Sequence, residues 1–484
     1  MMNNFWQCAL TAAVALTPLA NAIGIALTVD DTASIKAGAA IAANGLMKLY
    51  VNNATGIDPI KVGTFDKPIY WWEAGAVWGG LVDYWSYTGD ASYVSTTTEA
   101  LLAQKGPAND FMNVEWEKEL GNDDQVFWAL AAMSAAEQNF PAADVTWLEL
   151  AVNAFNTQIA RWDTATCNGG LRWQIYSSNN GYTYKNSISN GGLFQLSARL
   201  ARYTGNATYT EWATKVWDWS VGVGAIDAKY NIFDGAGVDQ NCTQFDKTQW
   251  SYNVAMYLYG AAAMYNTTSG AEPWATHTKG LLDNAKIFFG PADNSSQIAY
   301  EPACELIDTC NTDQLSFKAY LARWMAKTSV LAPAIDNGQV MPLLRASALG
   351  AATACSGEAD GTSCGYRWYI GGYDGKVGVG PQLAAMEVIQ ALLIGQAPAP
   401  ATQQSAHGGT TPQPSTPVAT PAPTTLLTST VPSSTTTAAP VTTPAPTTAT
   451  TAATSAINTA AAMSNLIRAI AGAAAKAQPA DAMF

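Results

Sequence analysis

Histidine is almost absent from this chain, and several kinds of chemistry are excluded with it. Only two histidines occur in 484 residues, and His407 lies in a Thr/Pro-rich stretch unlike folded sequence. A Ser-His-Asp triad would depend on His277 alone, and we expect that residue on a solvated helix face. A histidine-rich zinc site is excluded, and no CxxC spacing replaces it. We therefore expect neither a metal nor a cofactor.

Basic residues are also scarce. The 24 Lys and Arg stand against 37 Asp and Glu, a formal net charge of −13, and they form no cluster. Nucleic acid is therefore not an expected partner, because binding it requires Lys or Arg to neutralise phosphates. The sequence has no GxxxxGK[ST] phosphate loop and no GxGxxG motif opening a strand–helix unit. A neutral ligand such as a polysaccharide is compatible with this charge.

The N-terminal end carries an apolar run, residues 9–20, followed by Asn21 and Ala22. The small residues Ala20 and Ala22 fit a signal-peptidase site, although no basic residue precedes the run. The run is too short to span a bilayer. We therefore predict a signal peptide over residues 1–22 and a secreted protein. A buried N-terminal helix is the alternative.

Six cysteines remain after the predicted cleavage, and an even set in a secreted protein predicts disulfides. Short loops favour Cys304–Cys310 and Cys355–Cys364, which leaves Cys167 to pair with Cys242. Secretion also makes the Asn-x-Ser/Thr sequences candidates for glycosylation. These candidates are Asn53, Asn206, Asn241, Asn266 and Asn294.

The composition changes sharply after residue 396. Residues 397–457 are rich in Thr, Pro, Ala and Ser, a composition that cannot bury enough apolar surface to fold. They predict a disordered, O-glycosylated stalk. The Ala-rich tail, residues 458–484, follows small residues that suit a glycolipid-anchor signal. Three charged residues interrupt its hydrophobic stretch, namely Arg468, Lys476 and Asp481. The sequence leaves anchoring open, and we expect membrane contact only through such an anchor.

Residues 23–396 predict one helical domain. Apolar residues recur at helical spacing and alternating strands are scarce. The expected helices include 34–51, 69–87, 125–139, 145–162, 191–203, 209–219, 250–265 and 377–393. Tyr-Thr-Gly at 87–89 and at 203–205 is typical of a glycine that ends one helix before the next begins. About twelve helices in about six hairpins predict an all-α (α/α)6 barrel, a six-hairpin toroid; an α-solenoid is the competing architecture.

Two adjacent carboxylates, Asp123 and Asp124, directly precede one predicted helix. Composition alone favours a capping role, because Asp and Asn are common N-caps and acidic residues suit the first turn. Catalysis is the other interpretation: retaining glycosidases use two carboxyl groups about 5–5.5 Å apart. A helix N-terminus lowers both pKa values, so repulsion between the carboxylates would have to raise the pKa of the acid.

Seven short motifs, in order over about residues 27–395, resemble the fungal branch of glycoside hydrolase family 76. They are YWWEAGA (70–76), GNDDQ (121–125), GLRWQ (170–174), YKNS (184–187), QWSYN (249–253), CNTDQ (310–314) and MPLLRAS (341–347). The resemblance implies an (α/α)6 barrel and a retaining mannan endo-1,6-α-mannosidase. It assigns Asp123 as the nucleophile and Asp124 as the general acid/base. It also implies a signal peptide, a glycolipid anchor and a role in the cell wall.

Further residues in or beside these motifs are candidates for contacts with sugar. Four tryptophans could stack on sugar faces or belong to the core: Trp71, Trp72, Trp173 and Trp250. A polar loop could bind hydroxyl groups or be held by its own turns, through Tyr184, Lys185, Asn186 and Asn190. Asp313 and Gln314 could line the same cleft or cap a helix over 316–326.

The hypothesis is an endo-acting glycosidase for mannan or mannose-containing glycans, secreted to the cell surface, in the wall or on the outer face of the plasma membrane. Its second step could use water or wall glucan as the acceptor, and the sequence does not separate hydrolysis from transfer. A non-catalytic glycan-binding wall protein is the alternative from another class.

Overall fold

The computed structural model describes residues 24–290, 297–358 and 361–406. The predicted signal peptide, the sequon at Asn294, most of the predicted stalk and the Ala-rich tail lie outside these ranges. The description that follows concerns the helical domain alone.

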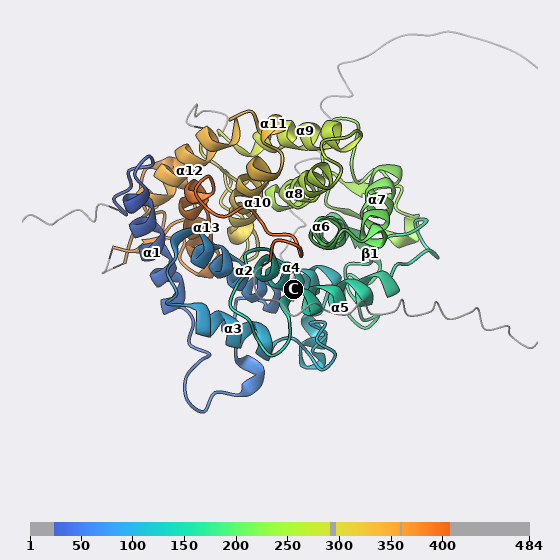
Figure 1. Ribbon diagram of the computed structural model, residues 1–484, viewed down its shortest axis with the longest axis horizontal. Helices are drawn as coiled ribbons and strands as arrows, with labels where there is room; N and C mark the ends of the chain where they lie inside the picture. The colour runs from blue at the N-terminus through green and yellow to red at the C-terminus, as the bar shows by residue number, and fades with distance from the viewer. Residues whose placement is uncertain (1–23, 291–296, 359–360, 407–484) are drawn as a thin grey trace, which may run out of the picture. The chain divides into compact units, whose positions relative to one another are not determined.

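Six helices of the described residues form an inner ring. They are α2 (Trp71–Thr88), α4 (Asn122–Glu137), α6 (Ser187–Thr204), α8 (Ser251–Thr267), α10 (Phe317–Leu331) and α13 (Val379–Gln390). Each packs against the next, and α13 packs against α2, so the ring closes (Figure 1). This closure confirms the (α/α)6 barrel and excludes the solenoid.

A second layer of helices surrounds the ring (Figure 1). It comprises α1 (Thr32–Lys48), α3 (Val94–Ala103), α5 (Trp147–Ala160), α7 (Ala207–Gly222), α9 (Trp274–Ala285), the short α11 (Pro333–Asp336) and α12 (Val340–Ala354). Outer α3, α5, α7 and α9 each pack on the inner helix that precedes them in the chain, while α1 and α12 cover α13. Short 3₁₀ helices lie in the connections: η1 (Pro59–Lys61), η2 (Val114–Glu119), η3 (Val238–Gln240), η4 (Lys286–Phe288), η5 (Gln314–Ser316), η6 (Trp368–Ile370) and η7 (Ala391–Leu393).

The apolar pattern of each helix explains its layer. Every residue of inner helix α4 is buried, as expected for a helix surrounded by others. Outer helix α5 buries residues at helical spacing, among them Leu150, Ala154 and Gln158, and leaves its other face to solvent. Gly89 and Gly205 adopt the left-handed conformation after α2 and α6, which confirms the predicted glycine caps.

Two small antiparallel sheets lie in the connections. Strands β1 (Tyr184–Asn186), β2 (Gly235–Gly237) and β3 (Phe245–Asp246) form one sheet, with Asn186 opposite Gly235. Strands β4 (Cys355–Gly357) and β5 (Ser363–Cys364) form the other. β1 runs directly into α6, so the first sheet lies at the N-terminal end of an inner helix.

All three predicted disulfides are confirmed: Cys167–Cys242, Cys304–Cys310 and Cys355–Cys364. The folded chain continues past the expected boundary at residue 396. The Ala401 N–H donates to the Glu137 carbonyl at 2.7 Å, and the Gln403 N–H donates to the Tyr203 carbonyl at 2.8 Å. These are backbone contacts, so the side-chain composition of the segment does not reveal them.

None of the described helices has the length and hydrophobicity that crossing a membrane requires.

Candidate active site

The adjacent aspartates lie in the first turn of α4. The helix begins at Asn122 with Gly121 as N-cap, so Asp123 and Asp124 are its second and third residues rather than residues that precede it. Oδ2 of Asp124 accepts the Gly121 N–H at 2.6 Å, and Oδ1 of Asp123 accepts the Asp124 N–H at 3.1 Å. The pair therefore caps the N-terminal end of the helix, and a carboxyl group can do this and still take part in catalysis, so the two interpretations are compatible.

Gly121 brings the two carboxyl groups together. A Cβ at this position would lie 2.4 Å from Oδ1 of Asp123 and 2.4 Å from Oδ2 of Asp124. The two oxygens are therefore no farther apart than twice that distance. Inverting glycosidases need carboxyl groups about 6.5–9.5 Å apart to admit a water between them, whereas retaining ones need about 5–5.5 Å. The arrangement over Gly121 fits the retaining class.

Strand β1 supports Asp123 from the other side. Nδ2 of Asn186 donates to Oδ2 of Asp123 at 2.9 Å, and Oδ1 of Asn186 accepts the Ser189 N–H and caps α6. The Asn122 N–H donates to the Trp173 carbonyl at 2.8 Å. The N-termini of α4 and α6 are thus joined through β1 and the loop that contains Trp173, which fixes the direction of the Asp123 carboxylate.

The two carboxyl groups have different proton affinities. Burial raises the pKa of Asp123 to about 6, with the hydrogen bond from Asn186 acting in the opposite direction. Burial also raises the pKa of Asp124 well above its usual value, and the negative charges of Asp123 and Asp313 add to the effect. Asp124 is therefore the carboxyl group of the pair that holds a proton more tightly, and Asp123 is the one that ionises first. We expected repulsion alone to oppose the helix N-terminus, but burial is the larger cause.

A third carboxylate, Asp313, faces the pair. The indole N–H of Trp72 donates to Oδ1 of Asp313 at 2.9 Å. Burial raises the pKa of Asp313 to about 6. Trp72 is partly exposed and packs on Phe127 with ring centroids 4.7 Å apart. These two predicted residues therefore lie on the α2 side of the site.

The α8 side is lined by aromatic residues. The Tyr184 hydroxyl donates to Oδ2 of Asp234 at 2.8 Å, and the nearby Trp250 indole lowers the pKa of the same carboxylate. The Tyr252 hydroxyl lies among carboxylates, and after burial the charges of Asp234 and Asp123 are the largest causes that raise its pKa. Sequence reasoning missed Gly121, Asp234 and Tyr252. Gly121 and Tyr252 lie inside motifs that signalled the site, whereas nothing in the sequence marks Asp234.

Four predicted sugar-binding residues have structural roles instead. Trp71 is buried, donates to Gln104 and stacks on Trp128. The buried Lys185 donates to the carbonyls of Asp163, Thr166 and Gly169, so its ammonium has no hydrogen bond left for substrate. Asn190 is buried and bonds the backbone of Leu171 and Asn186. Gln314 exchanges hydrogen bonds with Asn311 and caps its own turn.

Two further predictions require correction or comment. Trp173 packs its ring on Gly181 and positions Asn122 through its carbonyl, so its backbone serves the site. His277 does not lie on a solvated face: it is half-buried, stacks 4.4 Å from the ring of Trp217 and bonds the Tyr230 hydroxyl.

Four of the five predicted glycosylation sites fall in described residues. Asn53 and Asn206 are exposed. Asn241 is exposed, while its Oδ1 accepts the Cys167 N–H. Nδ2 of Asn266, the atom that would carry a glycan, donates to the Leu331 carbonyl at 3.4 Å. Asn266 is therefore the least available of these four.

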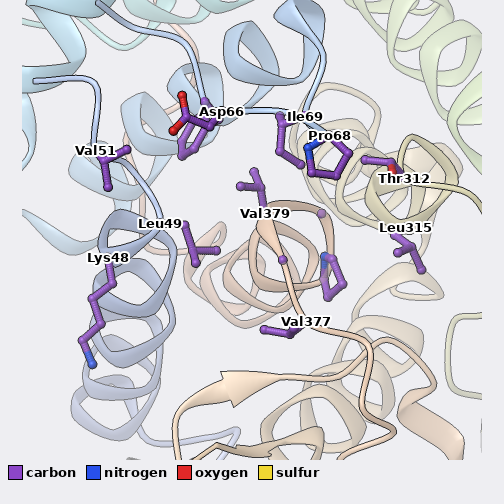
Figure 2. A pocket seen from close by; sticks show the side chains of 14 residues that line it. Lys48, Leu49, Val51, Asp66, Pro68, Ile69, Thr312, Leu315, Val377 and Val379 are labelled. Atoms are coloured by element: carbon purple, nitrogen blue, oxygen red, sulfur yellow. The ribbon is translucent and has the colours of Figure 1, made fainter. Parts of the chain in front are cut away.

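Two hollows border the site. One, of about 440 Å³, is lined mainly by aliphatic residues including Leu49, Ile69, Leu315 and Val379, between α1 and α13 (Figure 2). The other, of about 570 Å³, is lined by residues that include Trp250 and Lys247. Neither contains Asp123 or Asp124. The hollow of about 570 Å³ adjoins the aromatic α8 side of the site, because Trp250 lines the hollow and also lies on that side.

Known proteins resemble this chain in sequence and in fold. Residues 34–404 match Glycosyl hydrolase family 76. The chain is 46% identical over 412 residues to mannan endo-1,6-alpha-mannosidase DCW1 of Eremothecium gossypii, covering 83% of this chain and 88% of that protein. It is 44% identical to DCW1 of Saccharomyces cerevisiae, covering 80% and 85%. Among solved structures, Dfg5 from Chaetomium thermophilum in complex with glucosamine matches with a TM-score of 0.74 and 39% identity, covering 78% and 95%. With its closed barrel and its carboxyl pair at the start of α4, the chain belongs to glycosyl hydrolase family 76.

Proposed function

We propose that the protein is a retaining, endo-acting α-1,6-mannosidase that acts on mannan or mannose-containing glycans of the fungal cell wall. The observation that carries the proposal is the convergence of Asp123 and Asp124 over Gly121 with one proton between them. The names of the curated relatives support the choice of substrate.

The geometry supports one division of the two roles. Asp123, ionised and held by Asn186, attacks the anomeric carbon while the bond from that carbon to the glycosidic oxygen breaks. Asp124 gives its proton to the departing oxygen. In the second step Asp124 takes a proton from the acceptor hydroxyl, whose oxygen attacks the anomeric carbon and releases Asp123.

The acceptor decides between hydrolysis and transfer. Water yields a shortened mannan, whereas a hydroxyl of wall glucan yields a new glycosidic link. Both reactions share the covalent intermediate, and only the acceptor differs.

The proposal includes secretion to the cell surface, with glycosylated asparagines and a C-terminal glycolipid anchor. Three disulfides support an oxidising compartment. Edman sequencing of the mature protein tests cleavage after Ala22, and release of the surface protein by a phospholipase specific for inositol phospholipids tests the anchor.

The test of the activity is incubation of the secreted protein with α-1,6-mannan, with and without a β-glucan oligosaccharide. NMR of the first products should show the α-anomer, as retention requires. Asp123→Asn and Asp124→Asn should each lose at least about a hundred-fold in kcat. Asp218→Asn, an exposed carboxylate on α7, is the matched control and should keep full activity.

Other outcomes have definite meanings. A β-anomeric first product would contradict the double displacement. Wild-type protein that binds mannan without turnover would favour the glycan-binding alternative. A product that carries the β-glucan oligosaccharide would identify a transglycosylase.

A further inference from the structure

One carboxylate near the site has no role in the mechanism above. Asp234 precedes β2, and its backbone is held on both sides. The Ser187 N–H donates to the Asp234 carbonyl at 2.7 Å, and the Asp234 N–H donates to the Asp246 carbonyl at 3.1 Å. These bonds join Asp234 to the first residue of α6 and to β3, so the backbone position from which its side chain extends is fixed.

The side chain of Asp234 joins two aromatic residues from different elements. Tyr184, at the start of β1, donates its hydroxyl to Oδ2 at 2.8 Å. Trp250, the residue before α8, brings its indole N–H close enough to the same carboxylate to lower the pKa of Asp234. Hydrogen bonds to an ionised acceptor are stronger than neutral ones, so one carboxylate holds both rings.

Tyr184 is linked to the carboxyl pair, and Trp250 is linked to the hollow of about 570 Å³. Tyr184 is two residues before Asn186, whose amide bonds Asp123. Trp250 lines the hollow and packs edge-on against Phe317 at 5.6 Å between ring centroids. A glycan that leaves Asp123 on the α8 side would therefore pass these two rings before it reaches the hollow.

We infer that Asp234 is a positioning residue, whose carboxylate holds Tyr184 and Trp250 as the wall of the glycan site on the α8 side. The inference rests on the proposed function. Aromatic faces bind the C–H faces of pyranose rings, and their affinity depends on a fixed orientation. Asp234 therefore determines how tightly the sugar units beyond the carboxyl pair are bound, and it takes no part in proton transfer.

The test is Asp234→Asn in the full chain. Asparagine has one carbonyl oxygen and an amide group that cannot accept a hydrogen bond, so one of the two aromatic donors loses its partner. For α-1,6-mannotetraose we expect KM to rise about ten-fold while kcat stays within about two-fold. The pH limits of kcat should not move, because Asp123 and Asp124 set them.

Asp246→Asn is the matched control. Asp246 is an exposed carboxylate opposite β2, bonded through Oδ1 to Thr248, and its replacement removes the same charge without touching the rings. It should leave KM unchanged; an equal rise in KM would show that charge, not position, matters and would overturn the inference.

A second variant separates positioning from general destabilisation. Tyr184→Phe removes one donor, so adding it to Asp234→Asn should cost less than the product of the two single effects. Fully additive effects, or a fall in kcat with KM unchanged, would overturn the inference. Calorimetry of mannotetraose binding keeps the test independent of turnover. A wild type without mannan cleavage would refute the proposed function. Equal affinity of the wild type and Asp234→Asn for mannotetraose would refute the positioning role of Asp234.

Discussion

At the scale of single residues, Gly121 shows how a missing side chain can determine a site. One carboxyl oxygen of Asp123 and one of Asp124 occupy the space where a Cβ would lie. The φ of Gly121 is −93°, a value that any residue adopts, so the requirement is steric and not conformational.

Gly121→Ala should therefore abolish activity without changing the backbone. A methyl group 2.4 Å from each carboxyl oxygen forces the two groups apart, and we expect kcat to fall at least about a hundred-fold. The assay is mannan cleavage, with circular dichroism to confirm that the helices remain. Gly222→Ala, at the last residue of α7 with open space around the added methyl group, tests for a general cost of replacing glycine; an active Gly121→Ala protein would contradict the argument.

Asp123 also links activity to stability. Burial raises its pKa from 3.8 to about 6, so the folded state binds this proton more tightly than the unfolded state. Stability from this group is complete below about pH 4 and is lost as the pH rises through 6. Activity has the opposite dependence, because only ionised Asp123 can attack; kcat should decline below about pH 6.

Asp123→Asn should thus be inactive but more stable at pH 7, by about 1–2 kcal/mol. The gain should disappear near pH 4, where the wild-type carboxyl group is protonated. Scanning calorimetry at both pH values measures it, with Asp218→Asn as the unburied comparison. A melting temperature of Asp123→Asn below that of the wild type at pH 7 would show that the buried carboxylate of Asp123 does not destabilise the folded state.

At the scale of elements, helix α8 depends on a carboxyl group from a distant loop. Oε2 of Glu301 accepts the Ser251 hydroxyl at 2.6 Å, and its carboxyl group accepts the Ser251 N–H. The helix that carries Tyr252 and follows Trp250 therefore begins on a side chain from the segment beside the Cys304–Cys310 disulfide. Burial raises the pKa of Glu301 to about 8, so it is protonated at neutral pH.

Glu301→Gln should leave the melting temperature nearly unchanged at pH 7, because the amide oxygen can accept the same bonds. Glu301→Ala should cost about 2–3 kcal/mol through lost hydrogen bonds and a cavity. Since burial raises this pKa from 4.5 to about 8, the stabilisation from Glu301 is complete below about pH 4.5 and is lost as the pH rises through 8. The wild type should therefore be weaker at pH 9 than at pH 7, while the Gln variant is not. Urea denaturation at pH 7 and pH 9 tests this, and equal losses in both variants at pH 7 would refute it.

At the scale of the molecule, the inner ring is joined by a buried set of charges. Three acids and three bases come from five of its six helices: Asp83 from α2, Glu137 from α4, Arg199 from α6, Arg323 and Lys327 from α10, and Glu387 from α13. The sixth, α8, contributes Tyr259, whose ring faces Arg199. The charges balance, which makes their burial compatible with a stable fold.

Lys327→Met should be strongly destabilising, by about 3–5 kcal/mol, because it leaves the buried Asp83 without its ion-pair partner at 2.8 Å. Adding Asp83→Asn should recover part of the loss. Lys279→Met, which breaks an exposed pair with Asp283, should change stability by no more than about 0.5 kcal/mol. Urea denaturation measures all three, and a small effect of Lys327→Met would mean that the network is not essential.

The sequence determined the helices, their pairing, the three disulfides and the position of the aspartate pair, because these depend on local periodicity, on short loops and on contiguous motifs. The residues that tertiary structure reassigned are of a different kind. Trp71, Lys185, Asn190 and Gln314 lie in or beside the motifs that mark the candidate site, and only the contacts of each side chain in the folded protein reveal its structural role.

What the sequence could not give is the relation between Asp123, Asp313 and Asp234, which come from three distant segments. Asp313 was a candidate on its motif alone, and Asp234 was not identified. The carboxyl pair was visible as two letters, but its geometry over Gly121 and its unequal pKa values arise from burial at the end of a closed ring of helices. Burial is a property of the folded chain, and for that reason the sequence located the aspartate pair while the tertiary structure decided why the two carboxyl groups differ.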